Sequence, residues 1–132
     1  MNQANNIVLV VDDDDALRAA LKELFETEGY KVALAANGRA ALNRLSGGLR
    51  PCVVLLDLMM PVMDGWDFRE QQLRNPDLRE IPVFILTAVG FSEATIRAQF
   101  GDIRFVRKPP AHNDLLELVR TVSRGGSEPI PT

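Results

Sequence analysis

The sequence of 132 residues contains one cysteine, one histidine and no long apolar run. The single cysteine, Cys52, excludes an internal disulfide and a multi-cysteine zinc site, and the single histidine, His112, excludes a metal site built on two histidines. No apolar run approaches the ~18–20 residues of a membrane span, and the N-terminus lacks the basic region and cleavage site of a signal peptide. Basic residues are not in excess either: 15 against 18 acidic residues give a net charge of −3, which disfavours direct nucleic-acid binding. We therefore expect a cytoplasmic protein with neither a membrane nor a nucleic-acid partner.

The composition is that of an ordinary globular domain. Hydrophobic residues make up 46% and charged residues 25% of the chain, which argues against a disordered protein. The length fits one domain, which we place at residues 6–124. The last eight residues, GGSEPIPT at 125–132, are rich in glycine and proline, and we expect a flexible tail or a truncated linker there.

Short apolar runs alternate with segments of helical periodicity. The predicted strands are Ile7–Val11, Lys31–Ala35, Val53–Asp57, Pro82–Leu86 and Ile103–Val106. The predicted helices lie around Leu17–Phe25, Arg39–Leu45, Gly65–Arg74, Ser92–Phe100 and Asn113–Arg124. Strands that alternate with helices indicate a parallel sheet with helices on both faces. Continuous apolar strands, rather than alternating ones, are typical of a sheet covered on both sides.

Polar side chains follow the apolar strands at their carboxyl ends. Asp12 and Asp13 follow the first strand, Asp57 ends the third, Thr87 follows the fourth and Lys108 follows the fifth. In an open parallel sheet, ligands bind at this edge, near the point where the strand order reverses. If the order is 2-1-3-4-5, the first and third strands are neighbours, and the three aspartates converge.

The chemistry of this set favours phosphoryl transfer. Three close carboxylates repel one another, and a hard cation such as Mg²⁺ is their natural partner. Lys108 offers a compact positive charge for a phosphate oxygen, and Thr87 offers a hydroxyl donor. Sites of this kind work by positioning the transferred group and neutralising its charge. Asp57 is the best nucleophile, because an aspartate with an ordinary pKa of ~3.9 is ionised at neutral pH and needs no general base.

Four segments carry a resemblance to a known family. VVDDDDALRAAL, VVLLDLMMPVMDG, VFILTA and FVRKPP, in this order and spacing, resemble the receiver domain of two-component response regulators. The resemblance implies a flavodoxin-like, doubly wound α/β fold of five βα units, with a five-stranded parallel sheet in the order 2-1-3-4-5. It implies that Asp12 and Asp13 bind Mg²⁺ (or Mn²⁺), with Asp57 and the backbone carbonyl of Met59 as further ligands. Asp57 would be the phosphoacceptor.

The same resemblance implies a switch and its partners. Thr87 matches the switch hydroxyl, Lys108 the lysine that contacts the phosphoryl group, and Phe105 the aromatic residue whose rotamer reports the state. The peptide bond between Lys108 and Pro109 is expected to be cis. The phosphoryl donor would be a histidine kinase or a histidine phosphotransfer protein, since His112 is a poor candidate for that role. Phosphorylation would change the binding of an unknown output protein at the face formed by the fourth helix, fifth strand and fifth helix, where a homodimer would also form.

Some positions depart from the family pattern or have ordinary structural roles. The segment Gln99-Phe100-Gly101-Asp102-Ile103 stands where the family often has an Ala-Gly-Ala-like sequence. We therefore expect the fourth helix and its following loop to be short or irregular. Asp14 or Asp15 is expected to cap the first helix, and Asp64 to be a turn residue rather than a metal ligand.

Three other functions remain open at this stage. The first is a docking module that keeps the receiver fold but works without phosphorylation. The second is a phosphatase with an aspartate nucleophile; such enzymes usually carry a second aspartate two residues later, where this chain has Met59. The third is a flavodoxin-like carrier of FMN. We favour a signalling phosphoacceptor that is not an enzyme on external substrates, either as a stand-alone regulator or as one domain of a larger protein.

Overall fold

The computed structural model describes residues 6–87, 92–101, 103–108 and 110–123. Within them, five parallel strands form one sheet in the order β2-β1-β3-β4-β5, which confirms the predicted fold. The strands are β1 (Ile7–Val11), β2 (Lys31–Ala35), β3 (Val53–Asp57), β4 (Val83–Thr87) and β5 (Arg104–Arg107). The helices are α1 (Asp15–Thr27), α2 (Gly38–Ser46), α3 (Gly65–Arg74), α4 (Glu93–Phe100) and α5 (His112–Ser123). Pro109, with its predicted cis bond, and the predicted tail lie outside the described residues.

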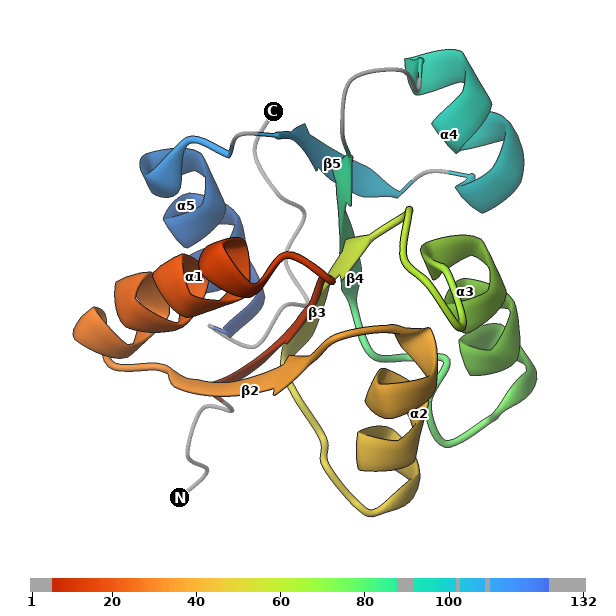
Figure 1. Ribbon diagram of the computed structural model, residues 1–132, viewed down its shortest axis with the longest axis horizontal. Coiled ribbons are helices and arrows are strands. Elements are labelled where there is room, and N and C mark those ends of the chain that lie inside the picture. The colour runs from red at the N-terminus through yellow and green to blue at the C-terminus, as the bar shows by residue number, and fades with distance from the viewer. Residues whose placement is uncertain (1–5, 88–91, 102, 109, 124–132) are drawn as a thin grey trace.

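The helices form a layer on each face of the sheet. Figure 1 shows α1 and α5 together on one side and α2, α3 and α4 on the other. None of the helices in the described part of the chain is long and apolar enough to cross a membrane. Apolar side chains are buried in two cores, one on each side of the sheet.

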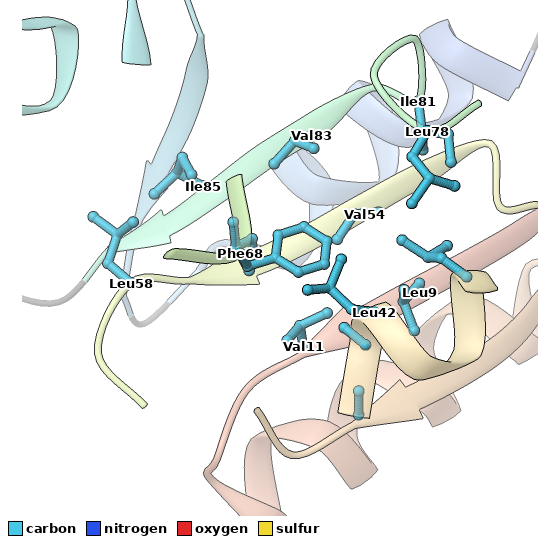
Figure 2. Close-up of a cluster of buried hydrophobic side chains, with 14 of the residues drawn as sticks. Leu9, Val11, Leu42, Val54, Leu58, Phe68, Leu78, Ile81, Val83 and Ile85 are labelled. Atoms are coloured by element: carbon cyan, nitrogen blue, oxygen red, sulfur yellow. The ribbon is translucent and has the colours of Figure 1, made fainter. Parts of the chain in front are cut away.

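The central strand β3 separates these two cores and is buried at every residue. Leu55 packs in the same cluster as Phe25 of α1, whereas its neighbour Leu56 packs in the cluster that contains Phe68 of α3. Figure 2 shows Phe68 projecting from α3 toward Val54 of β3. Complete burial of such a side chain contributes about 1.5–3 kcal/mol, so the cores hold the carboxyl end of β3 in a fixed place.

Two strands begin one residue later than predicted, β4 at Val83 and β5 at Arg104. Pro82 has no N–H to donate to a neighbouring strand, so it joins the sheet only through its carbonyl, which accepts a hydrogen bond from Val54 N at 2.9 Å. Ile103 is buried, but strand pairing starts at the following residue. The apolar runs thus predicted both strands correctly, but the first residue of each strand depends on where backbone pairing with its neighbour begins.

Two helices are preceded by an aspartate that caps their N-terminus. Asp14 accepts a hydrogen bond from Leu17 N at 3.1 Å at the start of α1, and Asp64 accepts one from Asp67 N at 2.9 Å at the start of α3. Both carboxylates satisfy amides that a helix leaves unpaired at its N-terminus. Asp14 therefore has the predicted capping role, and Asp64 likewise serves a helix start.

The fourth helix is short, as the sequence indicated. It spans eight residues and starts at Glu93, because Ser92 is the N-cap and accepts a hydrogen bond from Thr95 N at 3.1 Å. Gly101 follows with a positive φ of 74°, a conformation that glycine adopts without steric cost. The bounds of α2 and α5 differ by one residue at each end from those predicted.

The loop between β3 and α3 packs closely on its surroundings. Gly38 N at the start of α2 donates to Met63 O at 2.8 Å, and Gly65 N donates back to Leu58 O at 3.0 Å. Within this loop Val62 has a positive φ of 71° and is 81% exposed. A β-branched residue is strained in this conformation, which belongs to a three-residue turn closed by the hydrogen bond from Met63 N to Pro61 O at 2.8 Å.

We expect the substitution Val62→Gly to raise the free energy of unfolding by about 0.5–1 kcal/mol. Glycine removes a steric cost of about 1–2 kcal/mol, and its greater freedom in the unfolded chain offsets part of the gain. Chemical denaturation of the variant and the wild type measures the difference. Val62→Ala is the control: it keeps a Cβ, so its gain should be smaller. A Val62→Gly variant no more stable than the wild type would contradict the strain at this position.

Candidate functional site

Three aspartates meet at the carboxyl edge of the sheet. Val11 of β1 pairs with Leu56 of β3, so the residues that follow them, Asp12 and Asp57, lie side by side. Asp12 is fully buried, Asp57 is 3% exposed and Asp13 is exposed. One carboxylate oxygen from each of the three lies within 4.8 Å of the other two. The predicted convergence of the carboxylates is therefore present.

Lys108 brings a positive charge to this cluster from the end of β5. Its Nζ lies 2.7 Å from Oδ2 of Asp12 and 3.5 Å from Oδ2 of Asp57. Burial alone would lower the pKa of Lys108, but its hydrogen bonds and charge contacts with the two aspartates outweigh that effect and raise it. Lys108 is therefore fully charged at neutral pH and bridges two strand ends.

Asp57 has an unusually high pKa for an aspartate. Burial, together with the charge of Asp12, raises the pKa from its ordinary value near 3.8 to about 6. Lys108 and a long hydrogen bond from Met59 N to Asp57 Oδ1, at 3.4 Å, oppose this shift without cancelling it. The carboxylate is thus held in an environment that another cation would stabilise.

The cluster fits a hard cation. Oδ1 of Asp12 accepts a hydrogen bond from Asp14 N at 2.9 Å, and the buried Oδ2 lies 2.7 Å from Lys108 Nζ. Three carboxylates outnumber the one lysine, so negative charge remains to be neutralised. Carboxylate oxygens are the ligands that hard divalent cations prefer. The site could therefore hold a metal ion.

Two further predicted site residues lie on the neighbouring strands. β4 ends at Thr87, whose backbone pairs with Arg107, the residue before Lys108. The hydroxyl of Thr87 lies outside the described part of the structure. Phe105 on β5 is half-buried against the core on the α3 side, with the guanidinium of Arg107 5.7 Å from its ring centre. Thr87 thus stands at the carboxyl end of its strand, as predicted, and Phe105 lies within the neighbouring strand.

Met59 and Arg18 both contact aspartates of the cluster. The side chain of Met59 is 59% exposed, and its described contact with Asp57 is made by its amide. Arg18 was not predicted as a site residue, yet its Nη1 donates to the backbone carbonyl of Asp12 at 2.7 Å. A basic residue one helical turn after the capping Asp14 is the sequence signal that points back to the strand end.

The fold and the site together define a flavodoxin-like α/β domain with an acidic cluster and a lysine at the switch point of its sheet. Comparison with known proteins identifies the family within this class. The family described as response regulator receiver domain matches residues 8–120, and the chain belongs to it. It is thus a receiver domain of the response regulators, a signalling domain of two-component systems.

Individual relatives agree with this assignment. The response regulator MprA of Mycolicibacterium vanbaalenii is 37% identical over 118 residues, which are 89% of this chain and 50% of that protein. The chain spans about half the length of the curated relatives it matches. Among solved structures, the receiver domain of a histidine kinase from Syntrophus aciditrophicus has a TM-score of 0.82 at 30% identity, with 96% of each chain covered. The chemotaxis protein CheY4 of Vibrio cholerae has a TM-score of 0.78 at 29% identity, covering 90% of this chain and 99% of that one.

Proposed function

We propose that this receiver domain accepts a phosphoryl group on Asp57 from a phosphohistidine of a partner protein, a histidine kinase or a histidine phosphotransfer protein. The observation that carries the proposal is the position of the Asp57 carboxylate. It lies at the end of a fully buried strand, 3.5 Å from Lys108 Nζ and in one cluster with Asp12 and Asp13. The partner would meet the domain in the cytoplasm.

The proposed transfer makes one bond and breaks one. A carboxylate oxygen of Asp57 forms the new P–O bond while the P–N bond to the partner's imidazole breaks. The electron pair of that bond stays on the imidazole nitrogen, which takes up a proton. With a pKa of about 6, Asp57 is largely ionised at neutral pH and needs no base to activate it. Lys108 supports the step as a compact charge beside the phosphoryl oxygens.

The proposed metal ion is Mg²⁺ (or Mn²⁺). Asp12, Asp13 and Asp57 would hold it, with the backbone carbonyl of Met59 as a further ligand. When bound, the ion supplies neutralisation of the charge on the transferred group. The close approach of the three carboxylates, two of them buried, beside Lys108 supports this assignment.

The output would follow from the added charge. An acyl phosphate on Asp57 carries roughly −1.5 to −2 charge in place of the single negative charge of the carboxylate, so the site gains roughly −0.5 to −1. Thr87 and Lys108 would reorganise around it, and Phe105 would turn inward. We propose that this shifts the population between two packings of the face made by α4, β5 and α5, where an output protein or a second copy of the chain would bind.

Intact-protein mass spectrometry after incubation with a small acyl-phosphate donor tests the proposal. The wild type should gain one phosphoryl group when Mg²⁺ is present and none when a chelator replaces it. Asp57→Asn should gain none under either condition. Asp64→Asn is the matched control, because asparagine also caps helices, and it should behave like the wild type. A folded wild type without an adduct would favour the docking module that works without phosphorylation.

A further inference from the structure

Arg18 makes a contact that links α1 to the acidic cluster. It lies in the second turn of the helix, and its side chain is only 17% exposed. Nη1 donates a hydrogen bond to the backbone carbonyl of Asp12 at 2.7 Å, while Nη2 forms an ion pair with the carboxylate of Asp15. The two arms of one guanidinium thus join the end of β1 to the start of α1.

The carbonyl that Arg18 holds belongs to the peptide between Asp12 and Asp13. These are the two adjacent aspartates of the cluster, so the orientation of this peptide sets how their carboxylates diverge. The rest of Asp12 is already fixed: its amide donates to Ala35 O at 3.1 Å, its Oδ1 accepts from Asp14 N at 2.9 Å, and its Oδ2 meets Lys108. The backbone carbonyl of Asp12 takes no part in these contacts, and Arg18 restrains it through its hydrogen bond.

We propose that Arg18 is a positioning residue for the metal site. It holds the Asp12–Asp13 peptide so that both carboxylates face one cation, and it does so without touching the cation or the phosphoryl group. This role rests on the proposed function, because it presupposes that the cluster binds Mg²⁺. Asp15 keeps the guanidinium in place and compensates part of its charge.

The charge of Arg18 and its restraint on the peptide affect metal affinity in opposite directions. A positive side chain near the cluster repels a second cation, so loss of the charge alone would strengthen Mg²⁺ binding. Loss of the hydrogen bond to Asp12 O frees the peptide and would weaken it, because groups that orient metal ligands typically contribute about 10–100-fold in affinity. The sign of the change therefore separates a positioning role from a simple charge effect.

Calorimetric titration of the phosphate-free protein with Mg²⁺ measures this sign. Arg18→Met keeps much of the side-chain length but removes both donors and the charge, and we expect about tenfold weaker binding. Arg18→Lys keeps the charge and one donor group but loses the two-armed fork, and it should bind Mg²⁺ more weakly than the wild type. Arg74→Met is the matched control, since Arg74 pairs with Glu70 at 2.8 Å on α3, and it should bind like the wild type.

The rate of phosphorylation gives a second readout. If Arg18 acts only by placing the metal ligands, saturating Mg²⁺ should restore most of the rate of Arg18→Met with a small acyl-phosphate donor. If that variant does not fold, Arg18→Lys alone decides, and affinity equal to or greater than that of the wild type would overturn the role. Wild-type or tighter binding by a folded Arg18→Met would overturn it equally. Failure of the wild type to bind Mg²⁺ would instead overturn the metal site itself, and the role of Arg18 with it.

Discussion

Replacing Asp57 with asparagine is expected to stabilise the metal-free protein by about 3 kcal/mol at pH 7. The pKa of Asp57 is raised from 3.8 in its ordinary environment to about 6 in the fold, and each unit corresponds to about 1.4 kcal/mol. Because the folded state holds the proton more tightly than the unfolded state, the carboxylate lowers stability progressively as the pH rises from about 4 to about 6. Asparagine removes the ionisation and with it this loss of stability.

Denaturation of both proteins in a chelator, at pH 4 and at pH 7, measures this effect. The difference in unfolding free energy between the wild type and Asp57→Asn should be small at pH 4 and should reach nearly its full value at pH 7. Mg²⁺ should then stabilise the wild type more than the variant, since the variant lacks one of the proposed ligands. Asp64→Asn should leave the free energy of unfolding almost unchanged at both pH values. An Asp57→Asn variant that gains equally at both pH values, or loses stability at pH 7, would contradict the cost of burying the Asp57 carboxylate beside Asp12.

The substitution Gly65→Ala should damage both the fold and the proposed chemistry. A Cβ at this position would lie 2.4 Å from the backbone oxygen of Asp57 and 2.9 Å from the Cα of Leu58. Both are backbone atoms, so the clash can be relieved only by moving the end of β3 or the start of α3. We expect a loss of about 1–3 kcal/mol in unfolding free energy. A shift of the acceptor by an ångström would slow phosphorylation about 100-fold.

Gly47→Ala is the matched control for this prediction. Its Cβ would meet only Asn43 O at 3.4 Å and Arg44 O at 3.5 Å, which are ordinary contacts, and its φ is −79°. This variant should unfold and react with an acyl-phosphate donor like the wild type. If Gly65→Ala behaved in the same way, the close packing of α3 against Asp57 would not be needed to place the acceptor.

Much of the fold was predictable because its strands are buried on both faces. Such strands appear in the sequence as continuous apolar runs, and Val53–Asp57 has the bounds that its run indicated. The helix Gly65–Arg74 was likewise predictable at both ends, since Asn75-Pro76 follows it. The family motifs and the positions of the strand ends also predicted that Asp12, Asp13 and Asp57 lie together.

Contacts between distant segments could not be predicted in this way. Trp66 at the start of α3 stacks on Phe100 at the end of α4, with ring centres 4.6 Å apart and planes at 23°. Each ring was recognisable as apolar, but periodicity assigns a residue to a face and not to a partner. The sequence likewise does not reveal why position 65 requires glycine. The reason is that a Cβ there would collide with the backbone oxygen of Asp57. The contact of Arg18 with the Asp12 carbonyl depends on where α1 starts relative to β1.

Locating the phosphoryl group tests the central claim most directly. Borohydride reduces an acyl phosphate to an alcohol, so an aspartyl phosphate becomes homoserine, which peptide mass spectrometry can assign to one position. After reaction of the wild type with a small acyl-phosphate donor and Mg²⁺, we predict homoserine at position 57 and unmodified aspartate at Asp12, Asp13 and Asp64. Homoserine at another of these positions, or phosphorylated protein without any homoserine, would contradict the assignment of Asp57 as the phosphoacceptor.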